Sequence, residues 1–183
     1  MGTIFVDNIK QQSSQGSGTI TIGASGETVA LASGVVQSNL NYPAFLIRPT
    51  SAQSFSNNTY TKVAFDTAVI DTDSGFDNSN DRWTVPTGKG GKYLIAYQMM
   101  YAQGGGGSFN VNVHTRVNGA TNSGFSYWGS SDYYEGLNNT SVMTLSAGDY
   151  IELWSKQASG SAKNSYYFDQ GITLFLSGYR IGT

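Results

Sequence analysis

The stretch Gly91-Lys92-Tyr93-Leu94-Ile95-Ala96-Tyr97-Gln98 decides the fold of this chain. From residue 93 onward its odd positions are Tyr, Ile and Tyr, and its even positions are Leu, Ala and Gln. Alternation with period two is typical of a β-strand, whose successive side chains point to opposite faces. Both faces of this strand are therefore largely apolar. That is expected where one face packs in a core and the other packs on a neighbouring subunit.

The same period recurs along most of the 183 residues, carried by β-branched and aromatic residues between clusters of Gly, Ser and Asn. Charged residues make up 12% of the chain, whereas an average globular protein has about 25%. Apolar residues at 39%, including 12 Tyr, 9 Phe and 3 Trp, are enough for a core. Amphipathic helix patterns are nearly absent, so we expect an all-β fold with at most one turn of helix.

Charge and composition exclude several classes of function. The net charge is −2, and the 10 Lys and Arg are spread too thinly for a phosphate-binding patch, so we expect no nucleic-acid partner. The chain has no Cys, which excludes disulfides and thiolate metal sites. No apolar run approaches the roughly 20 residues that span a bilayer, and residues 1–7 lack the features of a secretory signal. We therefore expect no membrane insertion.

Composition divides the chain into two parts. In residues 1–42, short apolar strands alternate with Gly and Ser, and such strands are too short to enclose a core of their own. We predict an extended N-terminal segment for attachment and trimerisation. Residues 43–183 predict a compact sandwich of eight strands. The expected strands are 44–47, 61–70, 92–101, 109–118, 123–128, 141–145, 149–156 and 171–179.

Between residues 65 and 97, aromatic, acidic and glycine residues recur at fixed spacings, at Phe65, Asp71, Phe76, Trp83, Gly91, Tyr93, Ile95 and Tyr97. This pattern resembles the signature of the complement C1q globular-head family, which shares the tumour-necrosis-factor jelly roll. Trp83 and Ile95 stand where the family has Phe, and seven residues rather than five separate Trp83 from Gly91. The turn before Gly91 must therefore be longer than in the family.

Two further motifs support this resemblance. Residues 145–153, Leu-Ser-Ala-Gly-Asp-Tyr-Ile-Glu-Leu, are similar to a family hairpin, and residues 175–179, Phe-Leu-Ser-Gly-Tyr, are similar to its closing strand. The resemblance implies a C1q/TNF-like jelly-roll β-sandwich of ten strands that assembles into homotrimers. The candidate residues for the core or the trimer interface are Phe65, Phe76, Trp83, Tyr93, Ile95, Tyr97 and Phe175.

The N-terminal segment carries a second resemblance, through Gly2-Thr3-Ile4-Phe5-Val6-Asp7-Asn8-Ile9 and Gly18-Thr19-Ile20-Thr21-Ile22-Gly23. These stretches are similar to the lead-in of structural proteins of marine bacteriophages, including tail fibres, in which such a segment precedes a trimeric tip. The collagen stalk of the cellular relatives is absent from this sequence. The resemblance implies a virion protein whose N-terminal segment contacts other virion proteins.

Residues that could carry enzyme or metal chemistry are sparse. The single His, His114, falls on the face of its predicted strand opposite the apolar side chains, and we expect it to be a solvent-side polar residue rather than a catalytic base. The carboxylates Asp132, Glu135, Asp149, Glu152 and Asp169 could supply a glycosidase pair, but Asp149 follows a Gly in a turn signal. We predict that the protein is not an enzyme.

The acidic residues Asp71, Asp73, Asp77 and Asp81 do not have the spacing of an EF-hand, although their oxygens are of the kind that Ca²⁺ binds. Solvated turn residues are the favoured interpretation, so no cofactor is predicted and Ca²⁺ is the weaker alternative.

Aromatic residues gather among Ser and Gly in residues 125–136. Rigid rings beside small polar residues are typical of adhesive loops, so Tyr127, Trp128, Tyr133 and Tyr134 form the candidate receptor-binding loop. The alternative is that Phe125 and Tyr127 fill the sandwich or the subunit interface. We predict a homotrimeric bacteriophage fibre or spike on the particle surface that attaches to a glycan or protein of the host cell. The alternatives are a capsid or tail decoration or adaptor protein and a secreted lectin-like module.

Overall fold

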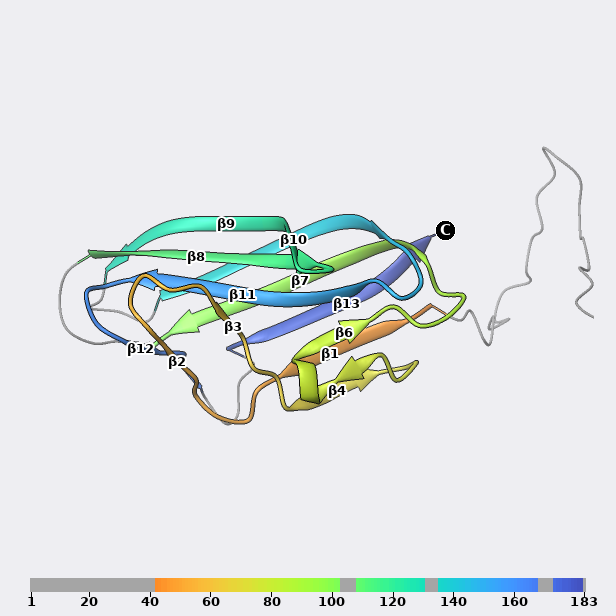
Figure 1. Cartoon of the computed structure of the whole chain (residues 1–183), viewed down its shortest axis with the longest axis horizontal. Coiled ribbons are helices and arrows are strands. Elements are labelled where there is room, and N and C mark those ends of the chain that lie inside the picture. The colour runs from red at the N-terminus through yellow and green to blue at the C-terminus, as the bar shows by residue number, and fades with distance from the viewer. Residues whose placement is uncertain (1–41, 103–107, 131–134, 168–172, 183) are drawn as a thin grey trace, which may run out of the picture. The chain divides into compact units, whose positions relative to one another are not determined.

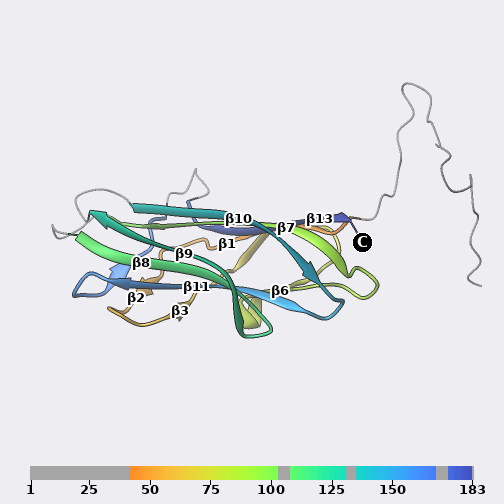
Figure 2. The ribbon, with the colours of Figure 1, turned by 90° about the horizontal axis from the view of Figure 1, so that it is seen from above.

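The computed structural model describes residues 42–102, 108–130, 135–167 and 173–182. The predicted N-terminal segment thus lies outside the described residues, except for Tyr42. In the described part, two antiparallel β-sheets face each other as the layers of a sandwich (Figure 1). Figure 2 shows the two layers from above, with β1, β7, β10 and β13 in one and β6, β8, β9 and β11 in the other. This confirms the prediction of an all-β jelly-roll sandwich.

The first sheet has five strands. Its order is β10 (Glu135–Leu145), β7 (Gly91–Tyr101), β13 (Phe175–Gly182), β1 (Ala44–Arg48) and β4 (Thr67–Asp71). The long pairing of β10 with β7 runs from Glu135 opposite Tyr101 to Leu145 opposite Gly91. The predicted strand at residues 141–145 is therefore only the end of a strand more than twice as long.

The second sheet has six strands. Its path is β5 (Phe76–Asp77), β6 (Arg82–Thr84), β11 (Tyr150–Ala158), β8 (Ser108–Val117) and β9 (Ala120–Ser130), and β3 (Thr61–Lys62) also pairs with β11. A small ribbon joins β2 (Ser54–Phe55) to β12 (Lys163–Asn164), and one 3-10 turn spans Asn78–Asn80. The two main sheets thus hold eleven strands in the described residues, compared with the ten that the resemblance implied. No helix in the described ranges is long and apolar enough to cross a membrane.

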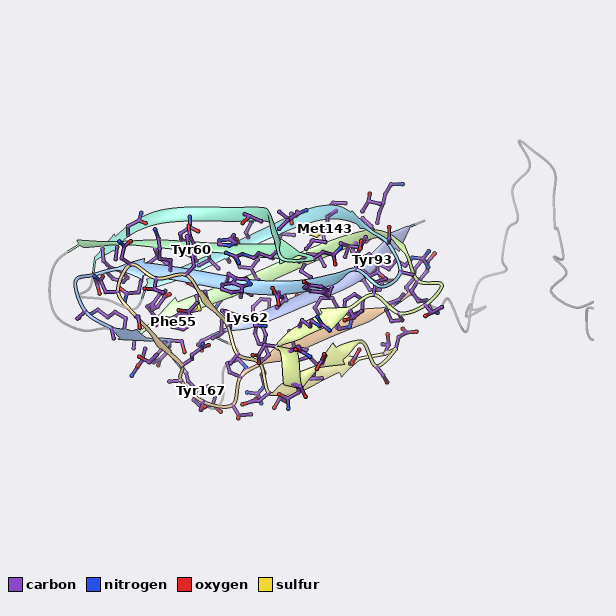
Figure 3. The ribbon with its side chains drawn as sticks, in the orientation of Figure 1. Phe55, Tyr60, Lys62, Tyr93, Met143 and Tyr167 are labelled. Carbon is purple, nitrogen blue, oxygen red and sulfur yellow. The ribbon has the colours of Figure 1, made fainter. Side chains whose placement is uncertain are left out.

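The core lies between the sheets and is rich in aromatic rings. Every second residue of β7 from Tyr93 to Tyr101 points into it. Trp83 stacks on Phe45 with ring centroids 4.3 Å apart and meets Tyr93 at 5.7 Å. Figure 3 labels Phe55, Tyr93 and Met143, three of the buried side chains of this core.

The predicted strand over residues 61–70 is wrong, because the chain changes sheet in its middle. The backbone amide of Val63 still donates to Leu153 O in the six-stranded sheet, at 2.9 Å, whereas that of Asp66 donates to Arg48 O in the five-stranded sheet, at 3.3 Å. The apolar pattern continues through the crossing because Val63 and Phe65 are both buried in the core. Periodicity reports burial, and it does not distinguish one strand from two that lie in different sheets.

The segment at residues 145–153 forms the predicted turn but not the predicted hairpin. Asp149 closes the turn, since its carboxylate accepts from Ser146 N at 2.7 Å and its own amide donates to Ser146 O at 3.0 Å. Gly148 takes a φ of +88°, which favours glycine. The strands on either side, β10 and β11, belong to different sheets, so the turn connects the two layers.

The signature residue Asp71 holds together the corner where β4 leads to β5. Its carboxylate accepts from the backbone amides of Gly75 at 3.0 Å and Phe76 at 2.9 Å, and from Trp83 Nε1 at 3.2 Å. The last bond explains how Trp83 is accommodated where the family has Phe. A buried indole N–H needs an acceptor, and Asp71 supplies it.

Two glycines of the resemblance stand where no side chain fits. Gly91 has a φ of +152°, and a Cβ there would meet Gly182 O. A Cβ at Gly178 would meet the ring of Phe45 and lie 2.7 Å from Ile95 Cδ1. Both glycines thus permit the close packing of β13 against β7 and the core.

We expect Asp71→Asn to lower the free energy of unfolding by about 1 to 3 kcal/mol, because at least one of three partly buried donors loses its acceptor. Urea denaturation followed by tryptophan fluorescence measures the change. Asp73→Asn is the control, because Asp73 is a nearby carboxylate whose partners are different ones. It accepts from the Thr72 hydroxyl and pairs with Lys89 at 3.5 Å. Equal losses in the two variants would contradict the role assigned to Asp71.

Candidate binding surfaces

The outer face of the five-stranded sheet is apolar along one row. Cross-strand pairing places Val142 of β10 beside Leu94 of β7, and Leu94 beside Tyr179 of β13. These three side chains are 57%, 40% and 48% exposed. Ile70, which pairs with Leu46, and Ile181 of the same sheet are also exposed, and so is Tyr42, whose ring lies 6.1 Å from that of Tyr179. Apolar side chains gathered on one face mark an interaction surface.

A shallow hollow of 310 Å³ lies in this face. Small residues of the outer face, Ala44, Ala96 and Ser177, contribute to its lining, and so do the larger side chains of Leu94, Ile70 and Tyr179. The hollow is open and mainly apolar, a shape suited to an apolar side chain from a second molecule.

The predicted core and interface residues divide between the inside and the surface. Phe65, Trp83, Tyr93, Ile95 and Tyr97 are buried in the core, and Phe76 is partly buried against it. Phe175 is the exception. It pairs with Gln98 on the outer face of the five-stranded sheet, so it lies on the surface that Leu94 and Tyr179 also share.

His114 is on the outer face of β8 as predicted, but the expectation of a solvent-side residue is wrong. Its side chain is only 4% exposed, because the ring of Tyr60 packs against it edge-on with centroids 5.0 Å apart. His114 Nδ1 lies 3.1 Å from Asn112 Oδ1, and Arg116 Nε donates to His114 Nε2 at 3.2 Å. These bonds suit a neutral ring with its proton on Nδ1. Burial lowers the pKa of His114, and the charge of Arg116 lowers it further.

The sequence carried no signal for this contact. Tyr60 stands in the irregular stretch before β3, where neither alternation nor spacing relates it to β8. The structure also places Lys156 Nζ 4.9 Å from the centre of the Tyr60 ring. Tyr60 is nevertheless 41% exposed.

The four acidic residues of the calcium alternative have separate partners. Asp71 serves the corner described above, Asp73 pairs with Lys89, and Phe65 N donates to Asp81 at 3.0 Å. Asp77 caps the 3-10 turn, and the hydrogen bond from Asn80 holds its pKa below the ordinary value. No group of three His, Asp or Glu side chains in the described ranges could hold a metal ion.

The carboxylates of the glycosidase alternative are also engaged where the structure describes them. Asp149 closes its turn and accepts from Asn118 Nδ2 at 2.8 Å. Glu152 is 8% exposed and accepts from Lys62 Nζ at 3.1 Å and Trp154 Nε1 at 2.9 Å. Asp132, Asp169 and the side chain of Glu135 lie outside the described part of the structure. That the protein is not an enzyme stays a prediction.

The predicted receptor-binding loop is described only in its backbone up to residue 130. Strand β9 pairs Tyr127 with Val111, a buried position, and Trp128 with Asn110 on the other face. The side chains of Tyr127 and Trp128 lie outside the described part of the structure, so both interpretations of this segment stay predictions. Tyr133 and Tyr134 lie outside the described residues.

Because the chain has a single His, a change in stability between about pH 5.5 and about pH 7.5 can be assigned to His114. Because the folded-state pKa of His114 is lowered, the unfolded chain binds more protons below its ordinary pKa of 6.5. We expect the free energy of unfolding to decrease as the pH falls from about 7.5 to about 5.5, and to be insensitive to pH just above that range. Urea denaturation at fixed protein concentration measures it. His114→Gln should flatten the profile, and a slope unchanged in this variant would refute the assignment.

Comparison with known proteins gives the fold but no family. No family model matches the chain. Among curated proteins, it is 28% identical over 120 residues to the uncharacterized protein YqcC of Bacillus subtilis (strain 168). The match takes in 59% of this chain and 30% of that protein, so the chain spans about a third of the length of this relative.

Among solved structures, the chain is similar to murine APRIL. The structure of APRIL at pH 5.0 matches with a TM-score of 0.55 at 20% identity, covering 76% of this chain and 99% of APRIL. Its structure at pH 8.5 matches with a TM-score of 0.54 at 18% identity, with the same coverage. The globular domain of the zebrafish complement 1qA protein matches with a TM-score of 0.47 at 14% identity, covering 76% and 96% of the two chains. The matches to APRIL, together with the two antiparallel sheets, show the jelly-roll β-sandwich fold that the sequence predicted.

Proposed function

We propose that this chain is the head of a homotrimer, in which the outer face of the five-stranded sheet of each copy packs against a neighbouring copy. The observation that carries this proposal is the apolar row of Val142, Leu94 and Tyr179. Burying an aliphatic side chain is favourable by about 1.5 to 3 kcal/mol, so a monomer in water forgoes this free energy at each exposed position.

The shape of the face supports a head-to-tail contact, in which different parts of the same surface meet around an axis. The face combines the 310 Å³ hollow with protruding side chains at Val142 and Ile181. A projection on one copy can thus enter the hollow of the next, and three such contacts close a ring. This assembly is also what the C1q resemblance implies.

We expect a mass of 58.8 kDa in solution, three times the 19.6 kDa of one chain. Sedimentation equilibrium measures it. Leu94→Asp places a charge in the middle of the apolar row, and burial of an unpaired charge is costly, so this variant should sediment as a monomer.

Thr121→Asp is the matched control, because Thr121 is an exposed residue of β9 in the other sheet. This variant should keep the mass of the wild type. A wild-type chain that sediments at 19.6 kDa at working concentration would refute the trimer.

We further propose that the trimer belongs to a bacteriophage virion, as a fibre or spike that attaches to a receptor on the host cell surface and contacts other virion proteins through residues 1–42. The support is the resemblance of the N-terminal stretches to phage tail-fibre proteins, together with the aromatic-rich residues 125–136. The decoration or adaptor role on capsid or tail is the other outcome. Labelled antibody viewed on particles by electron microscopy distinguishes the two positions.

We expect the triple substitution of Trp128, Tyr133 and Tyr134 by Ala to abolish adsorption of particles to host cells while the trimer persists, because the rings supply the contact area of the loop. Adsorption counts and sedimentation of the same variant measure the two effects. Unchanged adsorption would exclude this loop as the receptor-binding surface.

A further inference from the structure

Aromatic rings and cations pair on the outer face of the six-stranded sheet. The guanidinium carbon of Arg116 lies 3.9 Å from the centre of the Trp154 ring, and Lys156 Nζ lies 4.9 Å from that of Tyr60. Lys62 stands on the neighbouring strand β3, which pairs with β11 at Trp154. We call Tyr60, Lys62, Arg116, Trp154 and Lys156 the cation–aromatic patch. Figure 3 labels Tyr60 and Lys62 on the side of the molecule formed by β3, β8 and β11.

Buried polar groups hold the patch in position from beneath. His114 meets the Tyr60 ring edge-on and accepts from Arg116. Glu152 holds the other side, since its two carboxylate oxygens accept from Trp154 Nε1 at 2.9 Å and Lys62 Nζ at 3.1 Å. Side chains fixed before binding lose little conformational entropy when a ligand arrives.

The charge of the patch is opposite to that of the chain. Lys62, Arg116 and Lys156 contribute three positive charges, and Glu152, which contacts Lys62 and Trp154, contributes one negative charge. The whole chain has a net charge of −2. A cationic site on an acidic molecule attracts an anionic ligand to that site. The rest of the molecule, being acidic, does not attract polyanions.

The patch is open to ligand. Tyr60 keeps 41% of its surface exposed after its contacts with His114 and Lys156 are made. Opposite His114 on β9 stands Gly124, an exposed residue where a Cβ would come 2.7 Å from His114 Cβ. No side chain from that position of β9 therefore covers His114 or its neighbours.

We infer that the cation–aromatic patch binds an acidic polysaccharide whose sugar rings carry carboxylates. Sugar faces pack on the exposed ring of Tyr60, and the carboxylates form charge-assisted hydrogen bonds with Lys156 and Arg116. The inference rests on the attachment role proposed above and adds to the aromatic-rich loop a second contact with the host surface, for which it gives the chemical class of the ligand. It assigns the ligand to this sheet face, which lies outside the loop at residues 131–134.

Isothermal titration calorimetry of the full chain with tetragalacturonate tests this inference, with the methyl ester of the same saccharide as the uncharged control. The wild type should bind the acid at least about tenfold more tightly than the ester, since the ester lacks the charged partners. Raising the salt from about 0.05 M to about 0.5 M should weaken binding of the acid, because salt screens exposed charges.

Three variants locate the site. Lys156→Gln and Tyr60→Ala should each weaken binding about two- to fivefold, the range for loss of one exposed charge or ring contact. Lys163→Gln is the matched control, because Lys163 also lies over an aromatic ring, at 5.9 Å from Phe109, but belongs to the ribbon of β2 and β12. It should bind as the wild type does.

Three results would each overturn the inference: no binding of the acid at millimolar concentration, equal binding of acid and ester, or equal weakening in the Lys156 and Lys163 variants. Tighter binding of a dT tetranucleotide than of tetragalacturonate would overturn it in favour of a nucleic-acid ligand. The outcome is separate from the trimer. If the protein is a monomer that binds the acid, this inference stands and the proposed assembly is refuted. If it is a trimer that does not bind the acid, only the proposed assembly stands.

Discussion

Strand β7 buries Tyr93, Ile95 and Tyr97 between the sheets and at the same time leaves Leu94 40% exposed on the outside. Both faces of this one strand thus carry apolar side chains that are more stable when buried. The inner side chains explain why a second sheet must cover β7, and the ring of Trp83 on β6, 5.7 Å from that of Tyr93, supplies part of that cover. The outer apolar side chains are exposed to water in a single chain, and burying them between copies would be favourable. This gain in free energy is the physical basis of the proposed assembly.

Much of the fold was predictable because alternation follows burial directly. Strands β7, β8 and β11 were predicted within two residues at each end, because the inner face of β7 is apolar and most inner positions of β8 and the first half of β11 are too, although Thr115, Ser155 and Gln157 are buried polar residues. The prediction for β10 was too short for a structural reason. The start of β10 is polar, with Asn138, Asn139 and Thr140, and the backbone pairing with β7 keeps it in the sheet regardless of side-chain preference. Tertiary pairing of this kind leaves no trace in local composition.

The candidate surfaces were less predictable, because they depend on neighbours far apart in the sequence. The pattern around Leu94 indicated a second apolar face, and the structure extends it to Val142 and Tyr179 by cross-strand register. The contact of Tyr60 with His114 joins an irregular stretch to a strand more than fifty residues later, and only the path of the chain from β2 to β3 brings them together. A residue assigned to the outer face of a sheet was therefore buried by a loop crossing over it.

The two sheets can perform different tasks because their outer faces differ in chemistry. Association of proteins costs on the order of 4 to 15 kcal/mol in lost freedom, so one apolar contact cannot support it and a continuous face is required. The five-stranded sheet offers such a face, with exposed apolar side chains on β4, β7, β10 and β13. The six-stranded sheet instead presents cations held over rings, which resist burial against another apolar surface because the charges would lose their hydration. An assembly that hides the first sheet turns the second toward solvent, and this orientation leaves the cation–aromatic patch accessible in every copy.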